Sequence, residues 1–399
     1  MKSYRLPFGV QDYMPDECAN KELAEGRLAA VFRGRGYERV APGTLEFYDA
    51  FADALGRGGL NKMFKLTDSD GSLLVLRPDI TLQIMRIAAS KLDLSEPNRL
   101  YYIENSFEYL SDNSSARSRE FSQAGVELLG ESGAGGDVET VLTAIEALES
   151  TGLKNFLLDV GSVEFFRSLC EEFSIPDALA ARFAPLIDNK DLTGLESALS
   201  GANVTGARAE AFLALPSLYG GAEVLGGAAK ICGGKGCENA LNKLSAVLDA
   251  AKICGRASRV AVDLGMQKGG YYTGLVIRGV ARGSGVTILD GGRYDALGNK
   301  FGIQTEAVGF AIGTRRLLNA LDNEGSTAKG LAPCDAAYVS DGFSPAENAE
   351  VGRMRARGER VVKLFCGEER LIKYCAARGI KRAFVFTDGK MREAVKCGK

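Results

Sequence analysis

The spacing of apolar residues in the first part of the chain predicts long helices separated by short strands. Pro15 suits the first turn of a helix, where its missing N–H costs nothing, and Gly34 and Gly36 end that helix. A second helix is expected to begin at Asp137, interpreted as its N-cap, and to end at Gly152. The apolar stripes of these two helices are Leu23, Leu28, Val31 and Phe32, and Val138, Val141, Leu142, Ile145 and Leu148.

Short apolar runs between these helices predict strands. Residues 36–48 predict an edge-type strand followed by a loop. Pro78 ends a separate apolar run at 73–76. The further strands expected in this region lie at 73–76, 100–108, 121–129 and 156–160. Residues 163–253 then follow a helical pattern interrupted by glycine-rich turns, which predicts a helical insertion at about 163–255.

Strand patterns return after the insertion. They are expected at 260–264, 272–279, 286–289 and 307–312. The Asp-Gly-Gly-Arg sequence of Asp290–Arg293 is interpreted as a turn, and Thr314 as the cap of a helix at 315–321.

The last part of the chain predicts a separate small domain. Residues 322–330 are polar and small, which is typical of a linker. Strand and helix patterns alternate from 335 to 387, and this alternation predicts an α/β unit with a parallel sheet. The expected organisation is therefore a core at 1–325 and a C-terminal domain at 326–399.

Composition indicates a cytoplasmic globular protein. Of its 399 residues 46% are hydrophobic and 25% charged, and no apolar run approaches the roughly 20 residues of a membrane helix. Nine scattered cysteines, with no signal-peptide pattern at the N-terminus, fit reduced thiols. A net charge of −2 lacks the basic surplus typical of nucleic-acid binding, although a local basic patch stays compatible with it.

The absence of histidine from the sequence excludes several kinds of site. Serine–histidine triads, cysteine–histidine dyads and histidine-based zinc sites all need that residue. Cys232 and Cys237 have only Cys254 near them in sequence, too few ligands for zinc. The glycine-rich run at 226–236 lacks the Gly-Lys-Ser/Thr ending of a phosphate loop. We therefore expect no metal and no cofactor.

Five segments resemble histidyl-tRNA synthetase, a class II synthetase, and they occur in the same order over about 8–320. The resemblance implies an α+β fold, with an antiparallel sheet flanked by helices, a helical insertion and a small C-terminal α/β domain. The segments are Arg77–Thr81, Arg117–Glu127, Tyr271–Gly274, Gly291–Asp295 and Gly309–Gly313.

Departures from this family fall on its phosphate-binding arginines. Glu108 follows Phe107 where the family has an arginine, and Gln267 replaces the arginine of its histidine-specific segment. Arginine suits phosphate oxygens through its permanent charge and planar donors, so the resemblance implies that synthetase activity is lost. Replacement of that arginine by Lys268 is a less favoured alternative. Positions that match remnants of the nucleotide site are Arg117, Arg119 and Arg316.

Positions that bind the amino acid in the family are kept. The resemblance implies that four residues surround the amino group of a bound histidine, namely Asp79, Thr81, Gln123 and Glu127. It also implies that Tyr271 and Tyr272 border the imidazole. Carboxylates, an amide and hydroxyls are the groups that such a ligand requires. Retention for packing alone remains the alternative.

A synthetase-like body without phosphate-binding arginines is similar to the ATP phosphoribosyltransferase regulatory subunits. That resemblance implies a non-catalytic subunit, a short-form catalytic partner and feedback by histidine on the first step of histidine biosynthesis. It also implies a trimmed anticodon-binding domain without a tRNA partner, and a homodimer core, since Pro42–Leu45 resembles the class II dimer motif. The alternatives are an active histidyl-tRNA synthetase with divergent motifs and an amino-acid-ligating paralogue.

Overall fold

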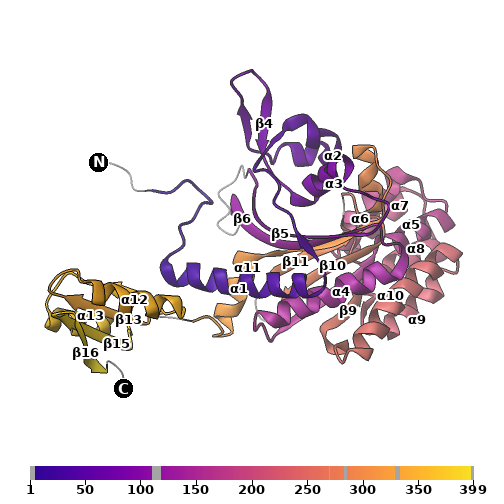
Figure 1. Ribbon diagram of the computed structural model, residues 1–399. Coiled ribbons are helices and arrows are strands. Elements are labelled where there is room, and N and C mark those ends of the chain that lie inside the picture. Colours follow the sequence, from indigo (N-terminus) through magenta and orange to yellow (C-terminus); the bar gives the residue numbers. More distant parts are fainter. Residues whose placement is uncertain (1–4, 110–117, 269, 283–284, 329–332, 397–399) are drawn as a thin grey trace. The chain divides into compact units, whose positions relative to one another are not determined.

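The chain forms two compact units, each described here by itself (Figure 1). The first comprises Met1–Tyr13 and Lys21–Ser326, and the second comprises Met14–Asn20 and Thr327–Lys399. The computed structural model describes residues 5–109, 118–268, 270–282, 285–328 and 333–396. No helix within these ranges is both long enough and apolar enough to cross a membrane.

A nine-stranded sheet forms the centre of the first unit. All its neighbouring strands are antiparallel except the pairs β1–β5 and β7–β9, which are parallel. This mostly antiparallel sheet confirms the expected α+β class. In spatial order its strands are β1 (Glu38–Arg39), β5 (Asn98–Phe107), β6 (Glu120–Leu129), β12 (Ala307–Gly313), β11 (Thr287–Arg293), β10 (Leu275–Ala281), β7 (Phe156–Ser162), β9 (Val260–Asp263) and β8 (Tyr219–Gly220).

A second, three-stranded sheet and five helices complete the core of this unit. The small sheet has the order β2 (Leu45–Phe47), β4 (Leu73–Leu76) and β3 (Lys65–Thr67). The helices are α1 (Pro15–Gly34, which belongs to this unit from Lys21 onward), α2 (Tyr48–Leu60), α3 (Ile80–Lys91), α4 (Gly133–Ser150) and α11 (Thr314–Asn323), with a 3-10 helix, η3, at Asp295–Phe301. Helices α2 and α3 had no counterpart in the sequence prediction.

The helical insertion between β7 and β9 contains six helices. They are α5 (Val163–Glu172), α6 (Asp177–Asp188), α7 (Leu192–Gly201), α8 (Ala207–Ala214), α9 (Glu223–Ile231) and α10 (Lys235–Ile253). The 3-10 turn η1 (Leu215–Ser217) and strand β8 lie between α8 and α9, and the 3-10 turn η2 (Ala257–Arg259) joins α10 to β9.

Three local predictions about helices need correction. Helix α4 begins earlier than expected: its N-cap is Ser132, and Asp137 lies inside the helix, where it is buried. Helix α11 likewise begins at Thr314, with Gly313 as its N-cap. In α1, Leu28 and Phe32 are buried as expected, but Leu23 is 49% exposed. Cap residues and apolar positions identify a helix well, but its neighbours decide its first residue and its buried face.

The predicted turn at Asp290–Arg293 is wrong, because these residues lie inside β11 and pair with both β10 and β12. The glycines had suggested a turn. A side chain at Gly291 would place its Cβ 2.4 Å from the carbonyl oxygen of Gly309 in the neighbouring strand. Close approach of two strands, rather than chain reversal, therefore explains glycine at this position.

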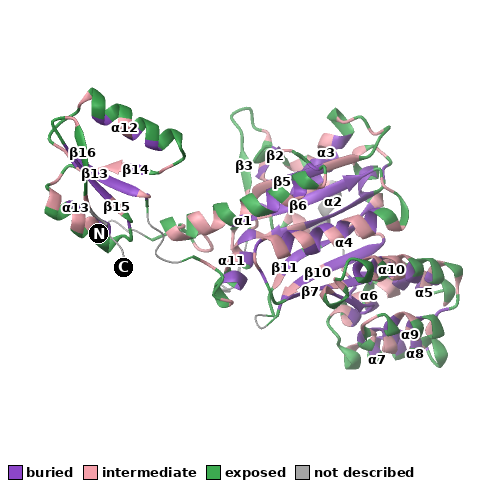
Figure 2. Cartoon of the chain, turned by 60° about the horizontal axis from the view of Figure 1, so that its bottom comes forward, coloured by how far each residue is buried: buried purple, intermediate pink, exposed green. Residues whose placement is uncertain are grey.

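The nine-stranded sheet is buried on both faces (Figure 2). Along strand β6, successive side chains alternate between the two faces of the sheet. Val126 and Leu128 join the cluster of buried side chains that includes α1, α4 and α10. Leu129 joins a second cluster, which includes Ile80 and Leu82 at the start of α3. Glu127 therefore points to the side of the sheet covered by α3.

The second unit is a four-stranded sheet with two helices. Its parallel strands confirm the expected alternation of strands and helices, but the final strand, β16, is antiparallel and was not predicted. In spatial order the strands are β14 (Val361–Lys363), β13 (Ala336–Ser340), β15 (Arg382–Thr387) and β16 (Lys390–Lys396), and the helices are α12 (Pro345–Ala356) and α13 (Glu368–Ala377).

Candidate functional site

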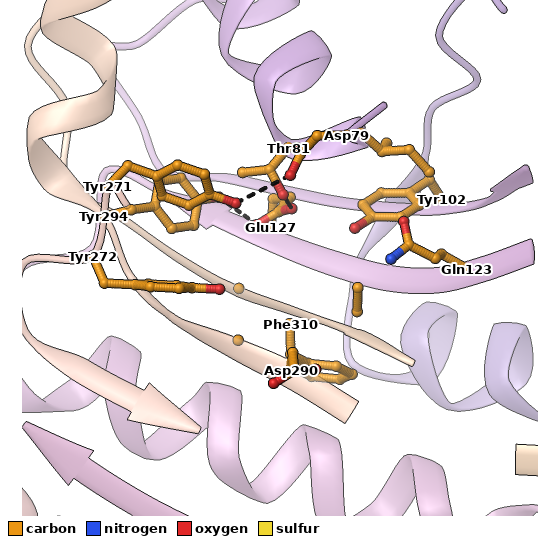
Figure 3. Close-up of a pocket in the computed structure, with 14 residues that line it drawn as sticks. Asp79, Thr81, Tyr102, Gln123, Glu127, Tyr271, Tyr272, Asp290, Tyr294 and Phe310 are labelled. Carbon is orange, nitrogen blue, oxygen red and sulfur yellow. Dashed lines mark hydrogen bonds between the residues drawn. The ribbon is translucent and has the colours of Figure 1, made fainter. Parts of the chain in front are cut away.

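A cavity of about 120 Å³ lies on the α3 side of the nine-stranded sheet (Figure 3). Carboxyl and phenolic groups dominate its polar surface. Its lining residues are Asp79, Ile80, Thr81, Tyr102, Gln123, Glu127, Tyr271, Tyr272, Asp290, Gly291, Tyr294, Gly309, Phe310 and Ala311.

All six residues predicted to bind an amino acid line this one cavity. Asp79 is the N-cap of α3 and accepts a hydrogen bond from the Leu82 N–H (3.0 Å), which places Thr81 in the first turn. Gln123 and Glu127 lie four residues apart on β6 and therefore share one face. The two tyrosines, Tyr271 and Tyr272, precede β10 and border one end of the cavity, where Tyr271 lies beside Asp79 at the start of α3.

Glu127 is the centre of a buried hydrogen-bond network. Its Oε1 accepts from the Thr81 hydroxyl at 2.7 Å, and the Tyr294 hydroxyl donates to Oε2. Nearby, the Tyr271 hydroxyl donates to Asp79 Oδ2 at 3.3 Å. Burial raises the pKa of Glu127 to about 8, because desolvation outweighs these hydrogen bonds, and burial also raises the pKa of Asp79. At neutral pH the Glu127 carboxyl is therefore mostly protonated.

Glycine in β12 makes room for this carboxyl. A Cβ at Gly309 would lie 1.9 Å from Glu127 Oε2. Gly309 pairs with Glu127 across the two strands, so any side chain there would push the carboxyl out of its network. This explains why the Gly-Phe-Ala-Ile-Gly segment carries a glycine at the site.

Four polar or aromatic lining residues were missed by the sequence analysis. Tyr294 belongs to the Gly-Gly-Arg-Tyr-Asp segment, so the motif itself could have identified it. Asp290 directly precedes that segment, and Phe310 lies within Gly309–Gly313. Tyr102 lies in the predicted strand at 100–108 and carried no local signal.

Two positions expected to have lost catalytic arginines lie away from the lining of the cavity. The Glu108 carboxylate forms an ion pair with Lys62 at 3.1 Å. Gln267 is buried, and its side-chain amide donates to the carbonyl oxygen of Leu264 at 3.0 Å. Neither side chain offers the cavity a positive charge.

The remnant arginine positions also make other contacts. The Arg119 guanidinium lies 5.1 Å from the centre of the Phe8 ring, a distance typical of a cation–π contact. Arg316 is exposed and donates to the carbonyl oxygen of Thr287 at 3.1 Å. Arg117 falls outside the described residues. Neither Arg119 nor Arg316 lines the cavity.

The expectation of reduced thiols fails for one pair of cysteines. Cys232 and Cys237 form a disulfide, with their Cα atoms 6.1 Å apart. Cys232 is the C-cap of α9 and Cys237 lies in the first turn of α10, so the short connection between these helices brings the two cysteines together. With Glu172 they form a three-residue group whose ligand atoms lie within 4.8 Å of one another. The absence of a resident metal stays a prediction.

Comparison with known proteins first defines the class. The histidyl-tRNA synthetase family model matches residues 9–317. A histidyl-tRNA synthetase structure from Nostoc has the same fold, with a TM-score of 0.81, 18% identity, and coverage of 98% of this chain and 97% of that one. The fold and the family model therefore define a class II, histidyl-tRNA synthetase-like protein.

Relatives then narrow the family. The regulatory subunit of ATP phosphoribosyltransferase from Acetivibrio thermocellus is 40% identical, over 80% of this chain and 76% of that protein. The subunit from Clostridium acetobutylicum is 35% identical, over 98% and 97%. A Bacillus halodurans structure, described as an ATP phosphoribosyltransferase regulatory subunit/histidyl-tRNA synthetase, has a TM-score of 0.82 and 27% identity, covering 96% of this chain and 98% of that one. The chain belongs to the ATP phosphoribosyltransferase regulatory subunits.

Proposed function

We propose that this chain is a non-catalytic subunit that regulates ATP phosphoribosyltransferase, and that its cavity binds histidine as a feedback effector. The observation that carries this proposal is that the six positions expected to bind an amino acid line one cavity, while Glu108 and Gln267, which stand where the family is expected to have arginines, lie outside its lining. The names of the relatives support the regulatory role and the catalytic partner.

The chemistry of the cavity matches the two ends of histidine. Asp79 and Glu127 offer carboxyls to the ammonium, while Gln123 and Thr81 offer hydrogen bonds. Tyrosine rings supply the apolar walls and hydroxyls that an imidazole needs. Polar groups of this kind, fixed by the network around Glu127, give a ligand site its orientation and specificity.

An active synthetase is the competing function. It would need cations at the reacting phosphate, where arginines contribute on the order of a thousandfold or more to rate. Glu108 and Gln267 supply none. We therefore expect no histidine-dependent exchange of labelled pyrophosphate into ATP. Exchange within a hundredfold of an authentic synthetase would instead support the competing function.

Histidine titration of the complex with the catalytic subunit tests the proposal. We expect histidine to bind and to inhibit phosphoribosyl transfer, and Glu127→Gln or Asp79→Asn to weaken both effects about ten- to a hundredfold. Both substitutions keep the shape of the side chain and remove its charge. Linkage requires the two effects to change together.

Glu108→Gln is the matched control, because it removes a carboxylate that is paired with Lys62 outside the cavity. It should leave the binding and inhibition curves unchanged. If both cavity variants also leave the two curves unchanged, the cavity is not the effector site. Histidine would then act at the subunit interface or on the catalytic partner.

A further inference from the structure

The cavity has a marked imbalance of charge. Three carboxyl groups line it, from Asp79, Glu127 and Asp290. Among the described lining residues there is no lysine and no arginine. Histidine brings a carboxylate as well as an ammonium, and its ammonium favours the ionised forms of Glu127 and Asp79, so its carboxylate would lie near negative charge. An amino-acid effector therefore needs a positive charge near one end of this cavity.

Lys268 is the described cation in direct contact with the lining. Its ammonium forms an ion pair with Asp290 and donates to the carbonyl oxygen of Ile277 at 2.8 Å. It also lies 5.9 Å from the centre of the Tyr272 ring, which borders the cavity on the same side (Figure 3). The side chain is only 11% exposed, so it is held in place rather than extended into solvent.

The Lys268 ammonium has an N–H donor that can bind a ligand. A lysine ammonium has three N–H donors, and in the described structure it has two oxygen partners. Burial lowers the pKa of Lys268, since desolvation disfavours its charged form, and a second carboxylate would offset that cost. The neighbouring Gln267 cannot take this role, because its amide faces the Leu264 carbonyl.

We propose that Lys268 binds the carboxylate of the effector at the Tyr272–Asp290 side of the cavity and so selects amino acids over amines of the same shape. This proposal rests on histidine binding in the cavity. The ligand then spans it, with its ammonium toward Glu127 and Asp79 and its carboxylate toward Lys268.

Two ligands that differ in the carboxylate test this assignment in the complex with the catalytic subunit. Histamine is histidine without its carboxylate. The unmodified complex should bind histidine about ten- to a hundredfold more tightly than histamine. Only histidine can form a charge-assisted hydrogen bond with Lys268, and such a bond in a buried site raises affinity by about this factor. Lys268→Met keeps the length of the side chain and removes the charge. It should weaken histidine binding at least about tenfold and change histamine binding less than about threefold.

Two further variants keep the test decisive. Lys62→Met removes a lysine that is paired with Glu108 outside the cavity, and it should change neither affinity. Asp290→Asn removes the competing carboxylate while Lys268 stays, so it should strengthen histidine binding relative to histamine even if Lys268→Met does not fold. Equal losses for both ligands in Lys268→Met, or no shift in preference in Asp290→Asn, would overturn the role of Lys268. Failure of the unmodified complex to bind histidine would instead overturn the proposed effector site.

Discussion

At the scale of single residues, Glu127 shows how a buried carboxyl can couple ligand binding to the release of a proton. It is 1% exposed, and its hydrogen bonds to Thr81 and Tyr294 do not fully offset its desolvation. Because its pKa is raised from an ordinary value of 4.5 to about 8, the carboxyl is neutral in most molecules at pH 7. A bound ammonium favours the ionised carboxylate, so it lowers that pKa again.

We therefore predict that histidine binding releases a proton from Glu127. Below pH 8 the free protein holds a proton that the complex loses, so affinity should rise with pH, by up to about tenfold per unit, and level off near pH 8. Calorimetry between pH 7 and 8.5, in buffers of different ionisation heat, counts this proton and avoids the titration of the ligand's imidazole near about 6.5.

Glu127→Gln serves as the control for that measurement, because an amide has no proton to release. Its weaker binding should show no proton release at pH 7 to 8. Proton release that persists in this variant would assign the effect to Asp79 or to another group.

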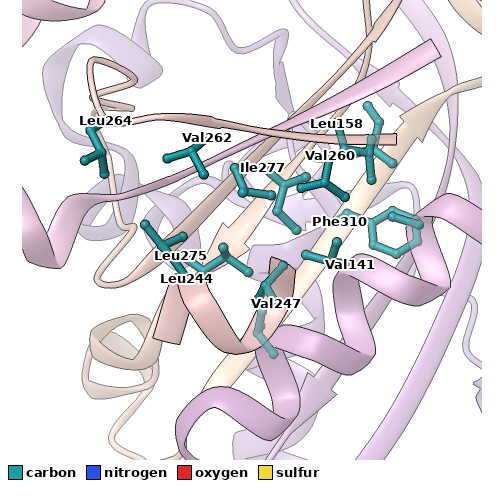
Figure 4. Close-up of a cluster of buried hydrophobic side chains, with 14 of the residues drawn as sticks. Val141, Leu158, Leu244, Val247, Val260, Val262, Leu264, Leu275, Ile277 and Phe310 are labelled. Atoms are coloured by element: carbon teal, nitrogen blue, oxygen red, sulfur yellow. The ribbon is translucent and has the colours of Figure 1, made fainter. Parts of the chain in front are cut away.

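At the scale of elements, a buried ion pair joins helix α4 to strand β11. Arg293 Nε donates to Asp137 at 2.8 Å, and its other nitrogens donate to the carbonyl oxygens of Glu131 and Gly133 at the start of α4. Asp137 and Arg293 are 1% and 3% exposed. Further along α4, Val141 packs in the apolar cluster with Phe310 and with side chains of α10 and the sheet (Figure 4). Arg293 therefore fixes the end of a helix that the core holds along its length.

We predict that Arg293→Met lowers the free energy of unfolding by about 3–5 kcal/mol, because it leaves Asp137 buried without its charged partner. Urea unfolding followed by circular dichroism measures this change. Glu146→Gln is the control: its pair with Arg35 is partly exposed, so its loss should cost no more than about 1 kcal/mol. Similar costs for both variants would contradict a special role for the buried pair.

At the scale of the whole molecule, an apolar face on the three-stranded sheet indicates self-association. Leu45 and Phe47 of β2 are 51% and 61% exposed, and Leu66 of β3 is 42% exposed. The strand registers place all three on one face, since Phe47 and Leu66 both pair with Leu74 of β4. Contiguous apolar side chains of this kind mark protein interfaces.

We predict that the isolated chain forms a homodimer through this face. Light scattering at micromolar concentration should give about twice the 42.5 kDa of one chain, and Phe47→Asp should reduce it to the monomer mass. Phe343→Asp is the matched control, because Phe343 is 83% exposed on the C-terminal unit. A monomeric unmodified chain, or dissociation by Phe343→Asp alone, would contradict this interface.

The sequence by itself determined most elements and the family. Strand β4 matches the expected 73–76, because a short apolar run before a proline is a local signal. Ordered segments of the sequence also predicted six positions for binding an amino acid, and all six line the cavity. Such signals lie in consecutive residues, so they can be recognised before the three-dimensional path of the chain is known.

Tertiary structure alone decided what depends on distant partners. Tyr271 and Asp79 are 192 residues apart in sequence and yet share a hydrogen bond, because α3 and the start of β10 meet over the sheet. Gly291 resembles a turn residue until β12 is placed beside it. The contact of Lys268 with Asp290 depends in the same way on how the chain before β10 returns to β11. Strand order sets these contacts, and strand order is a property of the packed sheet that no short stretch of sequence encodes.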